Sequence, residues 1–229
     1  MFYFDPMYMF YVMIPSLILT MWAQAKLRSA YARGQEVRAS SGMTGAETAQ
    51  RILDIHNIRN VAIERADSFL GDHYDSRAKV LRLSPDVYDG ESLTSVGIAA
   101  HEVGHAIQDA ESYAPLNLRN AIVPLAMTGT NLSWICIMAG LVLTQFRWLA
   151  VVGVLLFSLF VLFQIITLPV EFDASRRARA ILVGNGLVTH DEDQVVGKVL
   201  SAAAMTYVAA MLTAILQLLY YISLINRRR

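Results

Sequence analysis

Charged residues are scarce in this chain of 229 residues. They make up 17% of the sequence, whereas about a quarter is usual for a soluble domain. Hydrophobic residues make up 55%, the mean hydropathy is +0.42, and the apolar residues are gathered in long runs. This composition predicts an integral membrane protein that has the lipid bilayer as a partner. The 19 basic and 19 acidic residues cancel, so nothing favours a nucleic-acid partner.

Cysteine is nearly absent, and the sequence has no internal repeat and no low-complexity tract. Cys136 is the single cysteine and lies in an apolar run, so the chain can form no internal disulfide. A bound metal ion would therefore have histidine and carboxylate ligands rather than a set of thiolates.

Four apolar runs are long enough to cross a bilayer as helices. They extend from Phe4 to about Ala23, from Ala121 to Gln145, from Trp148 to Val170 and from Val199 to Ile225. Phe146 and Arg147 alone separate the second run from the third, which predicts a tight transmembrane hairpin. Pro169 is expected to kink or end the third run. Between the third and fourth runs, the Gly-Asn-Gly sequence at residues 184–186 predicts a helix stop, and Thr189–Glu192 has the spacing of a capping box.

The first run has two interpretations. Ala23-Gln24-Ala25 loosely fits the cleavage site of a signal peptide. However, no basic residue precedes the run, whereas Lys26, Arg28, Arg33 and Arg38 follow it. Since basic flanks stay in the cytoplasm, this pattern favours an uncleaved anchor with its N-terminus outside.

Short elements are predicted between the first and second runs. Thr44–Glu47 has the spacing of a capping box and predicts a helix that extends to about Ile58. Val61–Ile63 and Lys79–Leu83 read as two short β pieces. Polar and apolar residues alternate in Lys79–Leu83, which predicts a strand with one wet face. That strand is either an ordinary edge strand or one whose free edge receives an extended peptide.

The most informative stretch is the pentapeptide His101-Glu102-Val103-Gly104-His105. Side chains four residues apart lie on one face of a helix, so His101 and His105 can bind a single metal ion. Glu102 lies beside them, where it can accept a proton from a water molecule at the metal. This H-E-x-x-H pattern indicates a zinc site for peptide-bond hydrolysis. The alternative is a pair of histidines that binds no metal.

A catalytic zinc site needs a third protein ligand. The transmembrane hairpin returns the chain to the side of the His101 helix, so the ligand is expected within residues 171–198. The candidates there are Glu171, Asp173, His190, Asp191, Glu192 and Asp193. Glu171 is favoured, because a carboxylate at the end of a transmembrane helix is costly unless it is paired. Interfacial hydration, or a salt bridge with Arg176 or Arg177, is the competing explanation for it.

Two segments carry a resemblance to a known family. His101-Glu102-Val103-Gly104-His105-Ala106-Ile107-Gln108, taken with Leu168–Ala178, closely resembles the membrane neutral zinc metallopeptidases of the YugP type. The similarity extends over nearly the whole chain and includes the Thr44 helix and the strand end at Leu83–Pro85. More distantly, the sequence is similar to the HtpX and CaaX prenyl protease class of membrane peptidases.

The resemblance implies roles for individual residues. His101, His105 and Glu171 would bind one zinc ion per chain, and Glu102 would be the general base. In the distant class, an aspartate four residues after the ligand glutamate supports the site, and here that position holds Ser175. Asp173 lies two residues after Glu171 and is expected on a different helix face. Asp173 and Ser175 are therefore the candidates for orienting the histidines.

A hydrolytic site also needs a hydrogen-bond donor for the oxyanion. His73, Tyr74, Tyr113 and His190 are the candidates. A structural hydrogen bond explains each of them more simply, and the sequence does not choose among them.

These patterns predict a mainly α fold: a multi-span helical membrane protein with an H-E-x-x-H helix and a small β element in a membrane-proximal domain. The expected parts are an N-terminal transmembrane anchor (residues 1–25), a membrane-proximal catalytic region (26–120), a transmembrane hairpin (121–170), a polar helix carrying the third ligand (171–198) and a C-terminal transmembrane helix (199–229).

The predicted activity is that of a zinc-dependent endopeptidase of the cell membrane, acting on proteins or peptides that include membrane proteins. Two other classes stay open: a non-catalytic membrane scaffold or transporter component with a structural metal site, and an iron oxygenase with two histidines and one carboxylate. Glu102 argues against both, since a structural site uses four ligands and the oxygenase has no use for a free glutamate. The oligomeric state is not predicted.

Basic residues near the span ends predict the orientation of the chain. Most of them flank the metal site, from Lys26 to Arg38 and from Arg176 to Lys198, which places the site in the cytoplasm. Arg227–Arg229 contradict this orientation, unless the last run does not fully cross the bilayer.

Overall fold

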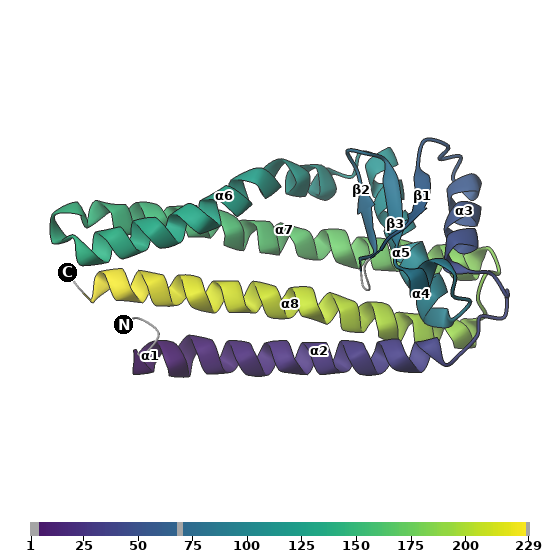
Figure 1. Ribbon diagram of the computed structural model, residues 1–229, viewed down its shortest axis with the longest axis horizontal. Coiled ribbons are helices and arrows are strands. Elements are labelled where there is room, and N and C mark those ends of the chain that lie inside the picture. Colours follow the sequence, from purple (N-terminus) through teal and green to yellow (C-terminus); the bar gives the residue numbers. More distant parts are fainter. Residues whose placement is uncertain (1–4, 68–70, 228–229) are drawn as a thin grey trace. The chain divides into compact units, whose positions relative to one another are not determined.

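The computed structural model describes residues 5–67 and 71–227, which are mainly helical and include one three-stranded sheet (Figure 1). The chain divides into two compact units. Unit 1 comprises Met1–Ala23, Asn117–Pro169 and Thr206–Arg229, and unit 2 comprises Gln24–Leu116 and Val170–Met205. Phe4, Arg228 and Arg229, at the ends of the predicted first and last runs, lie outside the described residues.

Four helical stretches are long and apolar enough to cross a membrane, as the sequence predicts. The first is Pro6–Gln35, built from α1 (Pro6–Tyr8), η2 (Met9–Met13) and α2 (Ile14–Gln35). The others are α6 (Ala114–Val142), α7 (Trp148–Gly184) and α8 (His190–Asn226). Large apolar side chains such as Leu17, Met21 and Leu155 are exposed on them, which is the surface that lipid contact requires.

Unit 1 contains the predicted hairpin, in which α6 and α7 flank the short 3-10 helix η3 (Thr144–Phe146). Gly140 and Gly153 permit a close approach of the two helices. A Cβ atom on Gly140 would lie 2.3 Å from the backbone nitrogen of Ala150, and one on Gly153 would lie 2.7 Å from the carbonyl oxygen of Ser133. Small residues at such crossings are typical of helices that pack within a membrane.

Pro169 lies inside α7 and does not end it. The helix continues to Gly184, and Gly186 follows with a positive φ of 66°, which agrees with the helix stop predicted at residues 184–186. Because α7 is continuous through Pro169, Glu171 and Asp173 are held on a helix rather than on a loop.

The sheet of unit 2 has the order β1-β3-β2, formed by β1 (Ala62–Arg65), β3 (Val80–Leu83) and β2 (His73–Asp75). β3 pairs in parallel with β1 and antiparallel with β2. The expectation that this strand has a free edge is therefore wrong, since β3 is the central strand. The reason is β2, a segment too short to show a strand pattern in the sequence.

The H-E-x-x-H helix α5 (Leu93–Ala110) forms the centre of unit 2. It packs against α3 (Gly45–Ile55), α4 (Pro85–Tyr88) and the strands β2 and β3 (Figure 1). Its residues Val96, Ala100 and Val103 are fully buried. The predicted capping box of α3 is confirmed, because Thr44 and Glu47 each accept a hydrogen bond from the other's backbone N–H.

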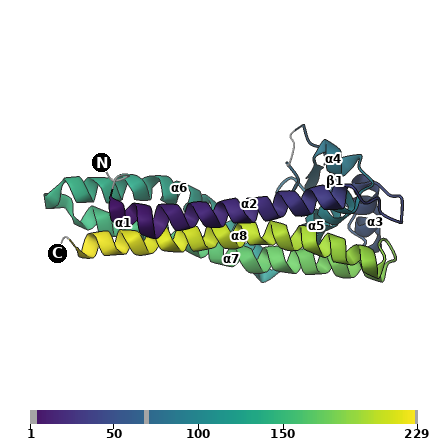
Figure 2. The same cartoon turned by 90° about the horizontal axis from the view of Figure 1, so that it is seen from below.

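Within unit 2, α2 lies beside α8, where Leu27 and Ala30 pack against Val199 and Ala202 (Figure 2). The second predicted capping box, at the start of α8, is also confirmed. Glu192 accepts from the Thr189 backbone N–H at 2.7 Å, and Thr189 Oγ1 accepts from the Glu192 N–H. Glu192 also binds the backbone and hydroxyl of Ser40 at 2.7 Å, which fixes the chain that follows α2.

Candidate metal centre

The α5 and α7 helices touch at Gly104. A Cβ atom at that position would lie 2.8 Å from the carbonyl oxygen of Ala174, so any larger residue would push the helices apart. His101 and His105 lie on either side of Gly104 on α5, and Glu171 lies one turn before Ala174 on α7. The close approach therefore brings the two histidines to the glutamate.

Three side chains converge at this contact. Glu171 Oε2 lies 3.3 Å from His101 Nε2 and 3.7 Å from His105 Nε2. The ligand atoms of His101, His105 and Glu171 all lie within 4.8 Å of one another. His105 and Glu171 are buried, with exposed fractions of 7% and 2%. Two imidazole nitrogens and one carboxylate oxygen that face a common point form a donor set suited to zinc.

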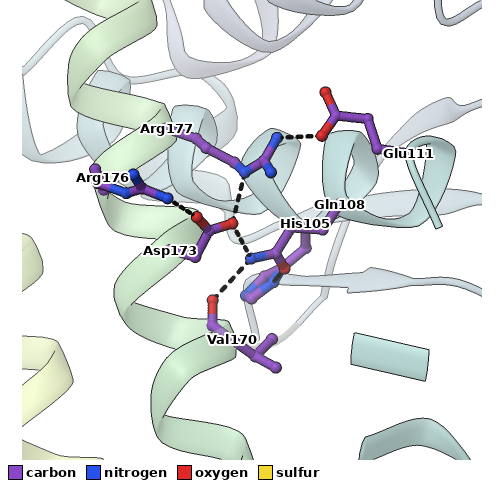
Figure 3. A network of polar contacts seen from close by, with 7 residues as sticks. All are labelled: His105, Gln108, Glu111, Val170, Asp173, Arg176 and Arg177. Carbon is purple, nitrogen blue, oxygen red and sulfur yellow. Dashed lines mark hydrogen bonds and ion pairs between the residues drawn. The ribbon is translucent and has the colours of Figure 1, made fainter. Parts of the chain in front are cut away.

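Glu171 Oε2 supplies an independent sign that a cation belongs here. This oxygen is buried, and it has no hydrogen-bond partner among the residues that the structure describes. A buried carboxylate oxygen without a donor is costly, and a divalent cation between the three side chains removes that cost. The competing salt bridges to Arg176 and Arg177 are not formed by Glu171, because both arginines bind Asp173 instead (Figure 3).

Gln108 holds His105 through a fully buried amide (Figure 3). Its Nε2 donates to Val170 O and to Asp173 Oδ2, each at 2.9 Å. Both acceptors are oxygens, so the amide orientation is fixed and Oε1 faces His105 Nδ1 at 3.0 Å. Nδ1 must then carry the proton, which leaves the Nε2 lone pair of His105 directed at Glu171 and free for a metal ion.

Asp173 anchors this amide and is itself held by two arginines. Arg177 Nε donates to Asp173 Oδ2 at 2.5 Å, Arg177 also binds Glu111 at 2.6 Å, and Arg176 binds Asp173 Oδ1. The sequence placed Asp173 on a different helix face from the ligand glutamate. That face points toward Gln108, so Asp173 reaches His105 indirectly.

Ser175 contacts the other histidine. Its Oγ lies 3.1 Å from His101 Nδ1, and the hydroxyl can accept a hydrogen bond from a protonated Nδ1. Ser175 thus contacts His101 from the position that holds an aspartate in the HtpX and CaaX prenyl protease class. Each histidine has a polar partner on Nδ1 and its Nε2 on the side of Glu171.

Glu102 lies next to His101 on α5 and is 8% exposed. Its charge is felt by His105: burial lowers the pKa of His105, but the carboxylates of Glu171 and Glu102 outweigh that effect and raise the pKa above its ordinary value. A cation bound by the three side chains would take the place of that proton.

The four candidates for an oxyanion donor make other contacts or lie at the surface. Tyr74 donates its hydroxyl hydrogen to Asp109 at 2.6 Å, and burial together with Asp109 raises its pKa. His73 is exposed, with Nδ1 2.7 Å from Gly71 O. Tyr113 lies under the guanidinium of Arg177, and His190 is exposed at the start of α8. Neither of the two histidines, His73 and His190, belongs to the described cluster of His101, His105 and Glu171.

The fold and the site together define a class: helical chains with several helices apolar enough to cross a membrane and a cluster of two histidines and a glutamate that could hold a metal ion. Residues 9–226 match the family described as “Putative neutral zinc metallopeptidase”, and the chain belongs to that family. It is 45% identical over 212 residues to the protein of Bacillus subtilis (strain 168) named “Putative membrane protease YugP”, covering 93% of this chain and 94% of the relative. No solved structure matches the chain. The resemblance to the membrane neutral zinc metallopeptidases is therefore confirmed.

Proposed function

We propose that the chain is an integral-membrane zinc-dependent endopeptidase. The observation that carries this proposal is the meeting of His101 Nε2, His105 Nε2 and the buried Glu171 Oε2, with Glu102 on the same helix. The family and the name of the relative support zinc and proteolysis. The substrate class is proteins or peptides, including membrane proteins.

His101, His105 and Glu171 would hold one zinc ion per chain. Bound zinc supplies a Lewis acid that polarises a scissile carbonyl and lowers the pKa of water. Glu102 accepts the proton of the attacking water and passes it to the leaving amine. Gln108 and Ser175 keep the imidazoles oriented, so that the site needs no rearrangement when it acts.

Two features favour this function over a scaffold with a structural metal site. The described residues bring together three ligands rather than the four of a structural zinc site. Glu102 is buried near the histidines although it is not one of the three. An oxygenase with the same ligands would leave Glu102 without a role.

Metal removal tests the activity. Treating the purified, detergent-solubilised chain with a chelator should abolish hydrolysis of an unfolded protein substrate, and about one equivalent of zinc per chain should restore it. Hydrolysis is followed by release of labelled peptides, and zinc content by elemental analysis. Activity that survives complete removal of zinc would contradict the proposal.

We also infer that the chain crosses the membrane four times and that the metal centre faces the cytoplasm. In a Cys136→Ser background, Glu36→Cys should resist an impermeant thiol reagent in intact cells, and Gln145→Cys should react. Both positions should react in permeabilised cells, which controls for accessibility. Labelling of position 36 but not 145 in intact cells would reverse the orientation.

A further inference from the structure

Unit 2 contains a second polar site, a groove of about 330 Å³ lined by residues of α2, α7 and α8. Its lining residues are Lys26, Ala30, Arg33, Arg179, Gln194, Gly197, Lys198, Ser201 and Ala202. Four of these are basic and none is acidic. The metal centre shares none of them.

Basic side chains dominate the lining of the groove. Asp193 neutralises Arg179 through two hydrogen bonds, at 2.9 Å from Nε and 2.5 Å from Nη2. The other three basic side chains, of Lys26, Arg33 and Lys198, are exposed and come from two helices. The floor is made of small residues, and a Cβ atom on Gly197 would lie 2.8 Å from Cζ of Arg179. The shape and charge suit a small anion.

The position of the groove along its helices identifies the kind of anion. From Pro6 to Ala25 the chain has no charged residue, and Lys26 is the first charged residue after this stretch. In α8, Lys198 is the last charged residue before the apolar stretch from Val199 to Asn226. Each helix therefore changes from polar to apolar at the groove, which is where a membrane-spanning helix meets lipid headgroups.

We propose that this groove binds the phosphate headgroup of an anionic phospholipid. The planar guanidinium of Arg33 matches two phosphate oxygens, and the ammonium groups of Lys26 and Lys198 add positive charge. The Ser201 hydroxyl can donate a further hydrogen bond. The acyl chains would then follow the uncharged stretches of α2 and α8.

Lipid binding to the full-length chain tests this proposal. The protein, purified in neutral detergent, is titrated with phosphatidylglycerol or phosphatidylcholine, and bound lipid is counted by native mass spectrometry. Arg33→Gln/Lys198→Gln should weaken phosphatidylglycerol binding by about 25-fold, taking about fivefold for each basic residue removed. The matched control Arg28→Gln/Arg51→Gln removes the same charge from exposed positions outside the groove and should retain binding.

Three results would overturn the proposal: equal binding of both lipids, equal losses in the variant and its control, or displacement of the lipid by millimolar inorganic phosphate. The last would identify a free-phosphate site. Circular dichroism melting shows that the variants are folded. Failure here leaves the metal centre untouched, because the groove and the metal ligands share no residue.

A second inference concerns Gln108 and rests on the proposed zinc site. We infer that Gln108 is a positioning residue, which acts on the metal through His105. Its amide is locked by Val170 O and Asp173 Oδ2, so its oxygen selects the His105 tautomer with the proton on Nδ1. Without that acceptor, the proton of His105 can move to Nε2, where it would block the lone pair that binds zinc.

Gln108→Met keeps the length of the side chain and removes the amide. Zinc affinity, measured by competition with a chromophoric chelator, should fall about 10–100-fold, and the ¹⁵N resonance of the protonated His105 Nδ1 should change. Gln50→Met, which removes an exposed glutamine from α3, should change neither. Gln108→Glu keeps an oxygen acceptor and should retain the Nδ1–H resonance.

The outcomes separate this inference from the proposed function. If the unmodified chain binds no zinc, the metal site itself is wrong. If it binds zinc and Gln108→Met binds it equally well with an unchanged Nδ1 resonance, only the role of Gln108 is wrong. Thermal unfolding of the metal-free variants confirms that the comparison is made between folded proteins.

Discussion

Replacing Glu102 by glutamine is expected to lower kcat for peptide hydrolysis by about 10²–10⁴-fold, the range that general acid–base catalysis contributes. Glutamine has the same shape but cannot accept the water proton. Glu102 is not one of the three converging ligands, so zinc content should stay near that of the unmodified chain. Turnover and zinc content are measured on the same preparation.

A matched acidic position controls for the loss of charge. Glu111 is an exposed residue at the C-terminal cap of α5, where it pairs with Arg177. Glu111→Gln should keep most of the activity. Near-normal hydrolysis by Glu102→Gln would show that Glu102 is not the general base. A loss of zinc from that variant would make Glu102 a ligand instead.

Replacing Glu171 by alanine is expected to have the second large effect, on zinc affinity. The free energy of zinc binding to structural sites is about 10–16 kcal/mol in total. Removing one of three ligands should therefore lower the zinc affinity by about 10²–10³-fold. Removing this side chain also takes away the carboxylate that faces both Nε2 atoms. Hydrolysis should fall with zinc occupancy and recover in part at high zinc concentration.

Asp173→Ala is the informative comparison for Glu171→Ala. Asp173 reaches His105 only through Gln108, so its removal should weaken zinc binding by about 10–100-fold, as changes next to a ligand do. If Glu171→Ala leaves zinc affinity unchanged, the third ligand lies elsewhere and the site must be reassigned.

Local signals in the sequence predicted much of the fold. The capping boxes at Thr44 and Thr189 and the helix stop after Gly184 depend on residues a few positions apart, and all three are found. The central place of β3 depends on its pairing with His73–Asp75, which is not visible in either segment alone. Pro169 was expected to kink or end its helix, and the helix does not end there.

The candidate site was predictable to a similar depth. His101 and His105 follow from their spacing, and Glu171 from its place at the end of an apolar run. The role of Gln108 required the structure, because it depends on the approach of α5 and α7 at Gly104. A sign was present nonetheless: a glutamine three residues after His105, on a helix whose neighbouring residues are apolar.

X-ray absorption at the zinc edge identifies the ligands of the bound metal ion. On the full chain loaded with one equivalent of zinc, we expect two imidazole nitrogens at about 2.0–2.1 Å together with oxygen ligands at about 2.0–2.2 Å. Scattering from one imidazole or none, or from a sulfur ligand, would contradict the assignment of His101, His105 and Glu171 as the metal centre.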